Sequence, residues 1–169
     1  MWQPGFAYAE RRIARLDGWH RSFCMKSIHY RGTVEHPGLV LALDRAEAGS
    51  CAGVAYGVPN ADAPSVLTYL RERELISSAY LETRLPIALT DGRKVDAATF
   101  VINRDHSQYA GVLSLEDQAQ VIATSHGEKG PNAEYLWNTA AHLTELGLAD
   151  PQLDWLTARV RGILAPDKG

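Results

Sequence analysis

The hydrophobic pattern of the chain changes near residue 114, and this change limits the folds that the chain can adopt. Before that residue, β-rich runs separated by turn residues surround one helical stripe, and after it three helical stripes follow one another. Strands, one helix, further strands and then three helices are typical of an α+β domain in which helices cover a curved antiparallel sheet. Because 169 residues are the length of one domain, we expect a single domain over residues 1–169.

The expected strands are β-rich runs bounded by glycine, proline and polar residues. Gly49 predicts a turn that joins the second and third runs into a hairpin. The Asp91-Gly92 dipeptide predicts the turn of a two-residue hairpin between the last two runs. A polar loop at 29–38 follows the first run and lies beside sheet ends, where functional residues often gather. The runs themselves are 21–28, 39–44, 51–58, 80–90 and 94–104.

Each expected helix begins at a capping signal. Asp62 indicates the start of the first helix, and Ser114 followed by Asp117 resembles a capping box at the start of the second. The third helix begins near Asn132, which we expect to act as its cap, and the fourth follows a capping Asp150. The last third of the chain is therefore expected to be helical.

Glu74 occupies a position where a hydrophobic residue would be expected. Ala63, Leu67 and Leu70 form an apolar stripe at helical spacing, and Glu74 continues that stripe. Burying a carboxylate is costly unless it is paired or neutral, so a residue in such a place usually has a function. The alternative is that the helix ends before Glu74 and leaves its side chain in water.

Composition argues against several classes of protein. The net charge is −3 and no long block of lysine and arginine occurs, which argues against a surface for nucleic acid or anionic membranes. No apolar run approaches the roughly 18 residues of a membrane span. The first residues also lack the pattern of a secretory signal. We therefore expect a cytoplasmic protein that binds neither nucleic acid nor membrane.

The cysteines and histidines form no recognisable metal site. Cys24 and Cys51 lack CxxC spacing, and the histidines, of which there are 6, show neither an HExxH motif nor an i, i+4 pair. Ser77 and Ser78 do not lie in a G-x-S-x-G elbow, so a serine hydrolase has no motif support. The sequence therefore predicts no metal.

Three separated segments of the chain carry a family resemblance. They read Gly-Val-Ala-Tyr at 53–56, Tyr-Leu-Arg-Glu-Arg-Glu at 69–74 and Gly-Pro-Asn-Ala-Glu-Tyr-Leu at 130–136. Further similar segments lie at 19–23, at 30–33 and between residues 105 and 116, so that the similarity spans nearly the whole chain. Together these segments resemble the ChaC-type γ-glutamylcyclotransferases.

This resemblance implies a small mixed β-barrel with surrounding helices. It also implies a cytosolic enzyme that converts a small-molecule substrate, glutathione, into 5-oxoproline and cysteinylglycine. No cofactor is implied, because the α-amine of the substrate attacks its own γ-carbonyl. The catalytic carboxylate of the family aligns with Glu74, which the helical stripe singles out independently, and it would act as general base and then as general acid.

Two further residues are candidates for substrate binding. Tyr135 resembles a pocket tyrosine of the family, and the alternative is a core aromatic residue whose hydroxyl is satisfied. Arg31 would bind a carboxylate of glutathione through two parallel hydrogen bonds, and the alternative is a solvated loop arginine. The sequence leaves both pairs of alternatives open.

The start of the chain departs from the family pattern. In the family, a first strand leads into a Tyr-Gly-Ser-Leu loop that holds the glutamyl group. This sequence begins Met-Trp-Gln-Pro-Gly-Phe and matches the family from just after that loop. We expect either a start assigned at an internal methionine or a degenerate relative. The alternative function is accordingly a non-catalytic γ-glutamyl-binding or protein-binding module of the same fold.

Overall fold

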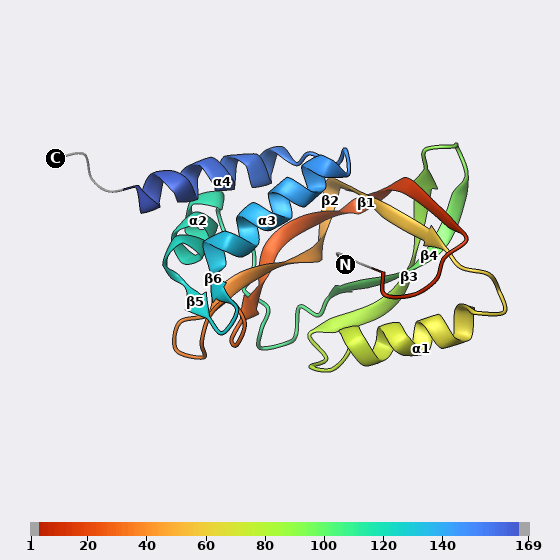
Figure 1. Ribbon diagram of the computed structural model, residues 1–169, viewed down its shortest axis with the longest axis horizontal. Coiled ribbons are helices and arrows are strands. Elements are labelled where there is room, and N and C mark those ends of the chain that lie inside the picture. Colours follow the sequence, from red (N-terminus) through yellow and green to blue (C-terminus); the bar gives the residue numbers. More distant parts are fainter. Residues whose placement is uncertain (1–3, 166–169) are drawn as a thin grey trace. The chain divides into compact units, whose positions relative to one another are not determined.

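The computed structural model describes residues 4–165, and residues 1–3, where the departure from the family pattern begins, lie outside that range. Contacts divide the chain into two compact units. The first unit consists of the residues up to Arg21 together with Leu43–His106, and the second of Ser22–Ala42 together with the residues from Ser107 onward. The elements labelled in Figure 1 are β1 Glu10–Ser27, β2 Gly38–Gly57, α1 Ala63–Glu74, β3 Tyr80–Leu89, β4 Lys94–Ile102, α2 Leu115–Thr124, β5 His126–Gly127, β6 Gly130–Pro131, α3 Asn132–Glu145 and α4 Pro151–Leu164.

The longer strands form one sheet in the order β2-β1-β3-β4. β3 and β4 are antiparallel neighbours, with Tyr80 opposite Ile102 at one end of the pair. In the turn that joins them Gly92 has a φ of 92°, a conformation that glycine adopts without strain. The hairpin predicted around Asp91-Gly92 is therefore confirmed, but its turn is longer than the two residues predicted, since the Leu89 N–H pairs with the Arg93 carbonyl.

The hairpin predicted with a turn at Gly49 is wrong. β2 continues through that position as one strand of 20 residues. A Cβ on Gly49 would lie 2.8 Å from the Ala46 Cβ and 3.3 Å from the Trp19 carbonyl oxygen, so the glycine allows a close approach and not a turn. β1 is also longer than predicted, since it begins at Glu10 and not at residue 21.

An ion pair between the buried Asp44 and the half-exposed Arg104 holds β2 at the point where the turn was expected to begin. The side chain of Asp44 is almost fully buried and accepts a hydrogen bond from Arg104 Nε at 2.7 Å. Arg104 Nη2 donates to the carbonyl of Arg45 at 2.8 Å. A buried carboxylate needs such a partner, and here the partner comes from the segment that follows β4.

The core of the first unit is formed by side chains of the neighbouring strands β1 and β3. Ala14 and Leu16 of β1 are buried together with Ile87 and Leu89 of β3, and the partly buried Leu85 packs against them. Leu85, Ile87 and Leu89 alternate along β3, a spacing that places their side chains on one face of the strand. This face is the one that packs into the core, with Ile87 and Leu89 buried and Leu85 partly buried.

The second unit buries the apolar faces of its helices. α4 packs against α2 and α3 (Figure 1). The side chains that are almost fully buried in this unit include Ile122 on α2, Leu136 on α3, and Leu156 and Val160 on α4. Within residues 4–165, no helix is both long and apolar enough to span a membrane.

The helix starts agree with the capping signals in two cases. The Ser114 side chain accepts a hydrogen bond from the Asp117 N–H at the start of α2, and the Asp150 side chain caps α4 in the same way. Asp62 precedes α1, but its backbone is already helical and its side chain makes no capping bond. The predicted N-cap position, Asp62, is therefore confirmed, but its side chain does not perform the capping.

Candidate active site

Glu74 is the last residue of α1, and its side chain is only 25% exposed. The helix does not fray before it, since the Leu75 N–H donates to the Arg71 carbonyl at 3.0 Å. Leu70, one turn earlier on the same stripe, is buried. The alternative of a solvated carboxylate beyond the helix is therefore wrong, and Glu74 lies at the edge of a buried surface.

Two arginines of α1 shortly precede Glu74, and their side chains have different partners. Arg73 Nε donates to Glu74 Oε1 at 2.9 Å. Arg71 instead makes two hydrogen bonds to Glu82 on β3, at 2.6 and 2.9 Å. Burial works against the charge of Arg73, but the Tyr69 hydroxyl and the Glu74 carboxylate outweigh it and raise the pKa of Arg73. Glu74 is therefore paired with a permanent cation.

Arg31 lies in the second unit and is not a solvated loop residue. Its side chain is 16% exposed, and Nη1 donates to Glu134 Oε2 at 3.0 Å and to the Pro131 carbonyl at 3.1 Å. The guanidinium lies over the ring of Tyr135, 6.0 Å from its centroid. The structure thus brings together the two residues predicted to bind substrate.

Tyr135 packs its ring into the second unit. Its ring meets the edge of Phe23 at a centroid distance of 6.0 Å, and its hydroxyl oxygen accepts a hydrogen bond from the Leu41 N–H at 3.4 Å. Burial raises the pKa of the Tyr135 hydroxyl, against the effect of the Leu41 N–H, so the phenol stays protonated at neutral pH. These contacts suit a core aromatic residue, and the role of Tyr135 in substrate binding stays a prediction.

The loop that carries Arg31 is held by the β5–β6 hairpin. The N–H groups of Glu128 and Lys129 donate to the carbonyls of His29 and Tyr30, both at 2.9 Å. The Arg31 N–H in turn donates to Ser27 Oγ at 3.0 Å. These backbone contacts fix the position of Arg31, so its side chain projects from a rigid support.

Asn132 has a role that sequence analysis missed. Its amide accepts a hydrogen bond from the Leu39 N–H at 2.6 Å and donates to the Leu39 carbonyl at 2.7 Å, and the side chain is completely buried. The expectation that Asn132 caps α3 is therefore wrong, because it is the first residue of the helix and bonds to β2. No local signal distinguishes this use of an asparagine from a cap.

Glu74 belongs to the first unit, whereas Arg31 and Tyr135 belong to the second. Within residues 4–165, no group of three or more histidine, cysteine, aspartate or glutamate side chains is arranged to hold a metal ion. Cys24 is buried, as expected of a small apolar side chain, and Cys51 is partly buried.

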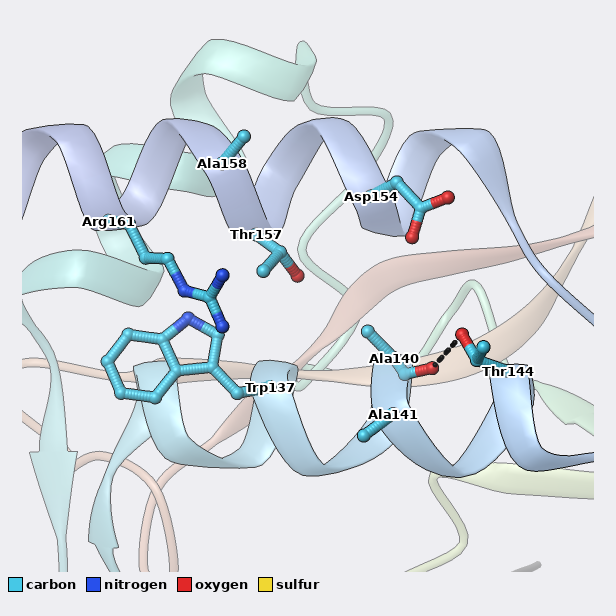
Figure 2. Close-up of a pocket in the computed structure, with 8 residues that line it drawn as sticks. All are labelled: Trp137, Ala140, Ala141, Thr144, Asp154, Thr157, Ala158 and Arg161. Atoms are coloured by element: carbon cyan, nitrogen blue, oxygen red, sulfur yellow. Dashed lines mark hydrogen bonds between the residues drawn. The ribbon is translucent and has the colours of Figure 1, made fainter.

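The second unit has a groove between α3 and α4. Figure 2 shows that the Arg161 guanidinium of α4 lies beside the Trp137 indole of α3. None of the three predicted site residues lines the groove, and we do not assign it to the active site. Its lining consists of Trp137, Ala140, Ala141, Thr144, Asp154, Thr157, Ala158 and Arg161.

Comparison with known protein families identifies the class of protein to which this chain belongs. The family described as "ChaC-like protein" matches residues 1–163. The chain therefore belongs to the ChaC-like family, and the family resemblance seen in the sequence is confirmed.

Curated relatives carry more specific names. The "Glutathione-specific gamma-glutamylcyclotransferase" of Escherichia coli is 38% identical over 98% of this chain and 71% of its own length. The "Gamma-glutamylcyclotransferase 2-3" of Arabidopsis thaliana is 30% identical over 98% of this chain and 86% of its own length. Both alignments cover nearly the whole chain, so the similarity extends over both units.

A solved structure shows the same fold. The yeast γ-glutamylcyclotransferase specific to glutathione superposes with a TM-score of 0.79, covering 96% of this chain and 94% of the yeast chain at 22% sequence identity. The predicted fold class, α+β of the γ-glutamylcyclotransferase type, is therefore confirmed.

Proposed function

We propose that this protein is a γ-glutamylcyclotransferase that degrades glutathione to 5-oxoproline and cysteinylglycine. The observation that carries the proposal is the 38% identity, over 98% of the chain, to an enzyme named for that activity. The partly buried Glu74 supports it, because the reaction needs one group that exchanges protons. The substrate is a small molecule, and we propose that the reaction takes place in the cytoplasm without nucleic-acid or membrane partners.

The reaction is an internal substitution. The α-amine of the γ-glutamyl group attacks its own γ-carbonyl carbon, a new C–N bond closes the five-membered lactam, and the original amide C–N bond breaks. From substrate to products, the attacking nitrogen changes from an ammonium group to the lactam N–H and loses two protons. The leaving nitrogen changes from an amide N–H to the ammonium group of cysteinylglycine and gains two. No cofactor is required, because no electron or group passes to a third molecule. Since both reacting groups belong to one molecule, the protein contributes mainly by fixing the attack geometry.

Glu74 is the proposed proton carrier. Its carboxylate would accept a proton from the substrate ammonium group before attack and a second from the same nitrogen as the lactam closes, and it would pass each proton to the leaving nitrogen. Such a role contributes roughly 10²- to 10⁴-fold in rate. Arg73 binds Oε1, and within residues 4–165 no hydrogen bond to Oε2 is recorded. Oε2 is therefore the oxygen we assign to proton exchange.

Arg31 and Tyr135 are the proposed substrate-binding residues. Among the described residues, both recorded hydrogen bonds of the Arg31 side chain use Nη1, so Nε and Nη2 remain for a carboxylate of glutathione. Tyr135 stays protonated and lies under the guanidinium. A substrate carboxylate would share Arg31 with Glu134, which is half-exposed and has room to move aside.

The test is the release of products from glutathione by the wild-type protein and by Glu74→Gln. We expect equal amounts of 5-oxoproline and cysteinylglycine from the wild type and none above background from the variant. Equal rates from both proteins would remove Glu74 from the mechanism. Saturable binding of glutathione without products from either protein would support the alternative, a non-catalytic γ-glutamyl-binding module.

A further inference from the structure

Arg73 lies between Glu74 and residues 4–9, which we term the N-terminal segment. Its Nε donates to Glu74 Oε1 at 2.9 Å, while Nη1 donates to the Pro4 carbonyl at 3.0 Å and to the Tyr69 hydroxyl at 3.1 Å. The guanidinium also stacks over the Tyr69 ring, 5.2 Å from its centroid. Each bond uses a different N–H of one rigid plane, so the direction of the Glu74 bond is fixed by the other two.

Nη2 of Arg73 is buried and has no hydrogen-bond partner among the described residues. A buried N–H of a cation without a partner lowers stability. A shorter or neutral side chain at this position would avoid that cost. The position of the guanidinium is therefore set by its three other hydrogen bonds, to Glu74, Pro4 and Tyr69.

The N-terminal segment is held tightly at both ends. At one end Gly5 has a φ of 72°, and a Cβ there would overlap the Tyr69 hydroxyl and lie 3.4 Å from Arg73 Nη1. At the other end the rings of Phe6 and Tyr8 pack against Tyr56 on β2, with centroid distances of 6.0 and 4.9 Å. The segment therefore connects the end of β2 to the last turn of α1.

We propose that Arg73 is a positioning residue that transmits the placement of the N-terminal segment to the Glu74 carboxylate. Because Arg73 holds Oε1, the carboxylate has one defined orientation, and this orientation fixes the position of Oε2. Displacement of the segment would rotate the guanidinium plane, and the carboxylate would rotate with it. This inference rests on the proposed role of Glu74 and adds that catalysis requires a correctly seated N-terminal segment.

The first test compares Arg73→Lys and Arg73→Gln with the matched control Arg71→Lys. Arg71 lies two residues earlier on the same helix, is exposed, and binds Glu82. Because a misplacement of about 1 Å costs roughly 10²-fold in rate, we expect kcat to fall roughly 10- to 100-fold in both Arg73 variants, with KM nearly unchanged. The control should stay close to the wild-type kcat. An Arg73→Lys protein with wild-type kcat would overturn the proposal, as would a change confined to KM or to melting temperature.

The second test changes Gly5 in the N-terminal segment, which packs against Tyr69 and Arg73. Gly5→Ala should reduce kcat, and combining it with Arg73→Lys should add little, because both changes break the same connection. Independent effects that multiply in the double variant would show that the segment does not act through Arg73, and would overturn that part of the proposal.

A third measurement does not depend on activity. The carbon-13 signal of the Glu74 carboxyl carbon, assigned by its loss in Glu74→Gln, should shift in Arg73→Lys and in Gly5→Ala but not in Arg71→Lys. An unchanged signal in Arg73→Lys overturns the inference even if the protein releases no product. Conversely, equal product release by the wild type and Glu74→Gln contradicts the proposed function, whereas normal kcat in the Arg73 variants contradicts only this inference.

Discussion

Replacing Asn132 by alanine should destabilise the second unit more than its position at a helix start suggests. The asparagine amide is the hydrogen-bond partner of both the N–H and the carbonyl of Leu39, at 2.6 and 2.7 Å. Leu39 is itself buried, at 2% exposure, so water cannot easily replace the lost partner. Asn132→Ala would therefore leave two buried backbone groups unsatisfied at the beginning of β2.

The size of the effect follows from these two groups. An unsatisfied buried donor or acceptor costs roughly 1–3 kcal/mol, so the pair costs about 2–6 kcal/mol. Alanine regains roughly 0.5 kcal/mol because its helix propensity exceeds that of asparagine. We therefore expect the free energy of unfolding to fall by about 2–5 kcal/mol, equivalent to roughly 4–20 °C in melting temperature for a chain of this size.

Urea denaturation followed by tryptophan fluorescence measures this change, and Asn138→Ala is the matched control. Asn138 lies on the same helix but is exposed, so its replacement should change the unfolding free energy by no more than about 0.5 kcal/mol. A difference between the two variants below about 1 kcal/mol would refute the argument, because it would mean that Leu39 finds other partners when the amide is removed.

Two further predictions concern the second unit. Gly127→Ala should lower the free energy of unfolding by at least about 1–3 kcal/mol, since its Cβ would lie 2.5 Å from the Gly32 nitrogen and from the His29 carbonyl oxygen. Gly162→Ala on α4, whose Cβ would have no neighbouring atom within 4 Å, should raise it by up to about 1 kcal/mol. Equal melting temperatures of the two variants would contradict this prediction. Arg159 holds the pKa of Glu116 at about 2, below the ordinary 4.5, so the pair stabilises the folded state above pH 4.5 and this contribution is lost as the pH falls towards 2. The melting temperature of the wild type should therefore fall more steeply than that of Glu116→Gln over that range, and parallel curves would contradict the assignment.

Features set by neighbouring residues were predictable from the sequence. Ser114 and Asp150 cap helices by bonding to N–H groups two or three residues ahead, and Gly92 provides a positive φ within its own turn. Glu74 was found because a helical stripe needs only a few turns of sequence to be visible. These arrangements depend on short stretches of chain, so their patterns survive without knowledge of the fold.

Features set by distant residues were not predictable. Gly49 carries the local signal of a turn, but β2 stays extended next to the bond between Asp44 and Arg104, which lie 60 residues apart. Asn132 carries the local signal of a cap, but its amide bonds to Leu39, 93 residues earlier. In each case a tertiary contact decided between conformations that the local sequence allows equally.

The position of Glu74 at the end of α1 explains why its replacement should affect activity much more than stability. A carboxylate near a helix C-terminus is disfavoured by roughly 0.3–1 kcal/mol, because the exposed carbonyls there carry partial negative charge. Glutamine removes that repulsion and keeps an oxygen that accepts from Arg73 Nε, although the neutral bond is weaker than the charge-assisted one by about 1 kcal/mol. The two changes nearly cancel. The free energy of unfolding of Glu74→Gln should therefore lie within about 1 kcal/mol of the wild-type value, although the variant should release no product. A loss of stability above roughly 2 kcal/mol would instead indicate that Glu74 is retained as a structural partner of Arg73, and lost activity in that variant would then say nothing about proton transfer.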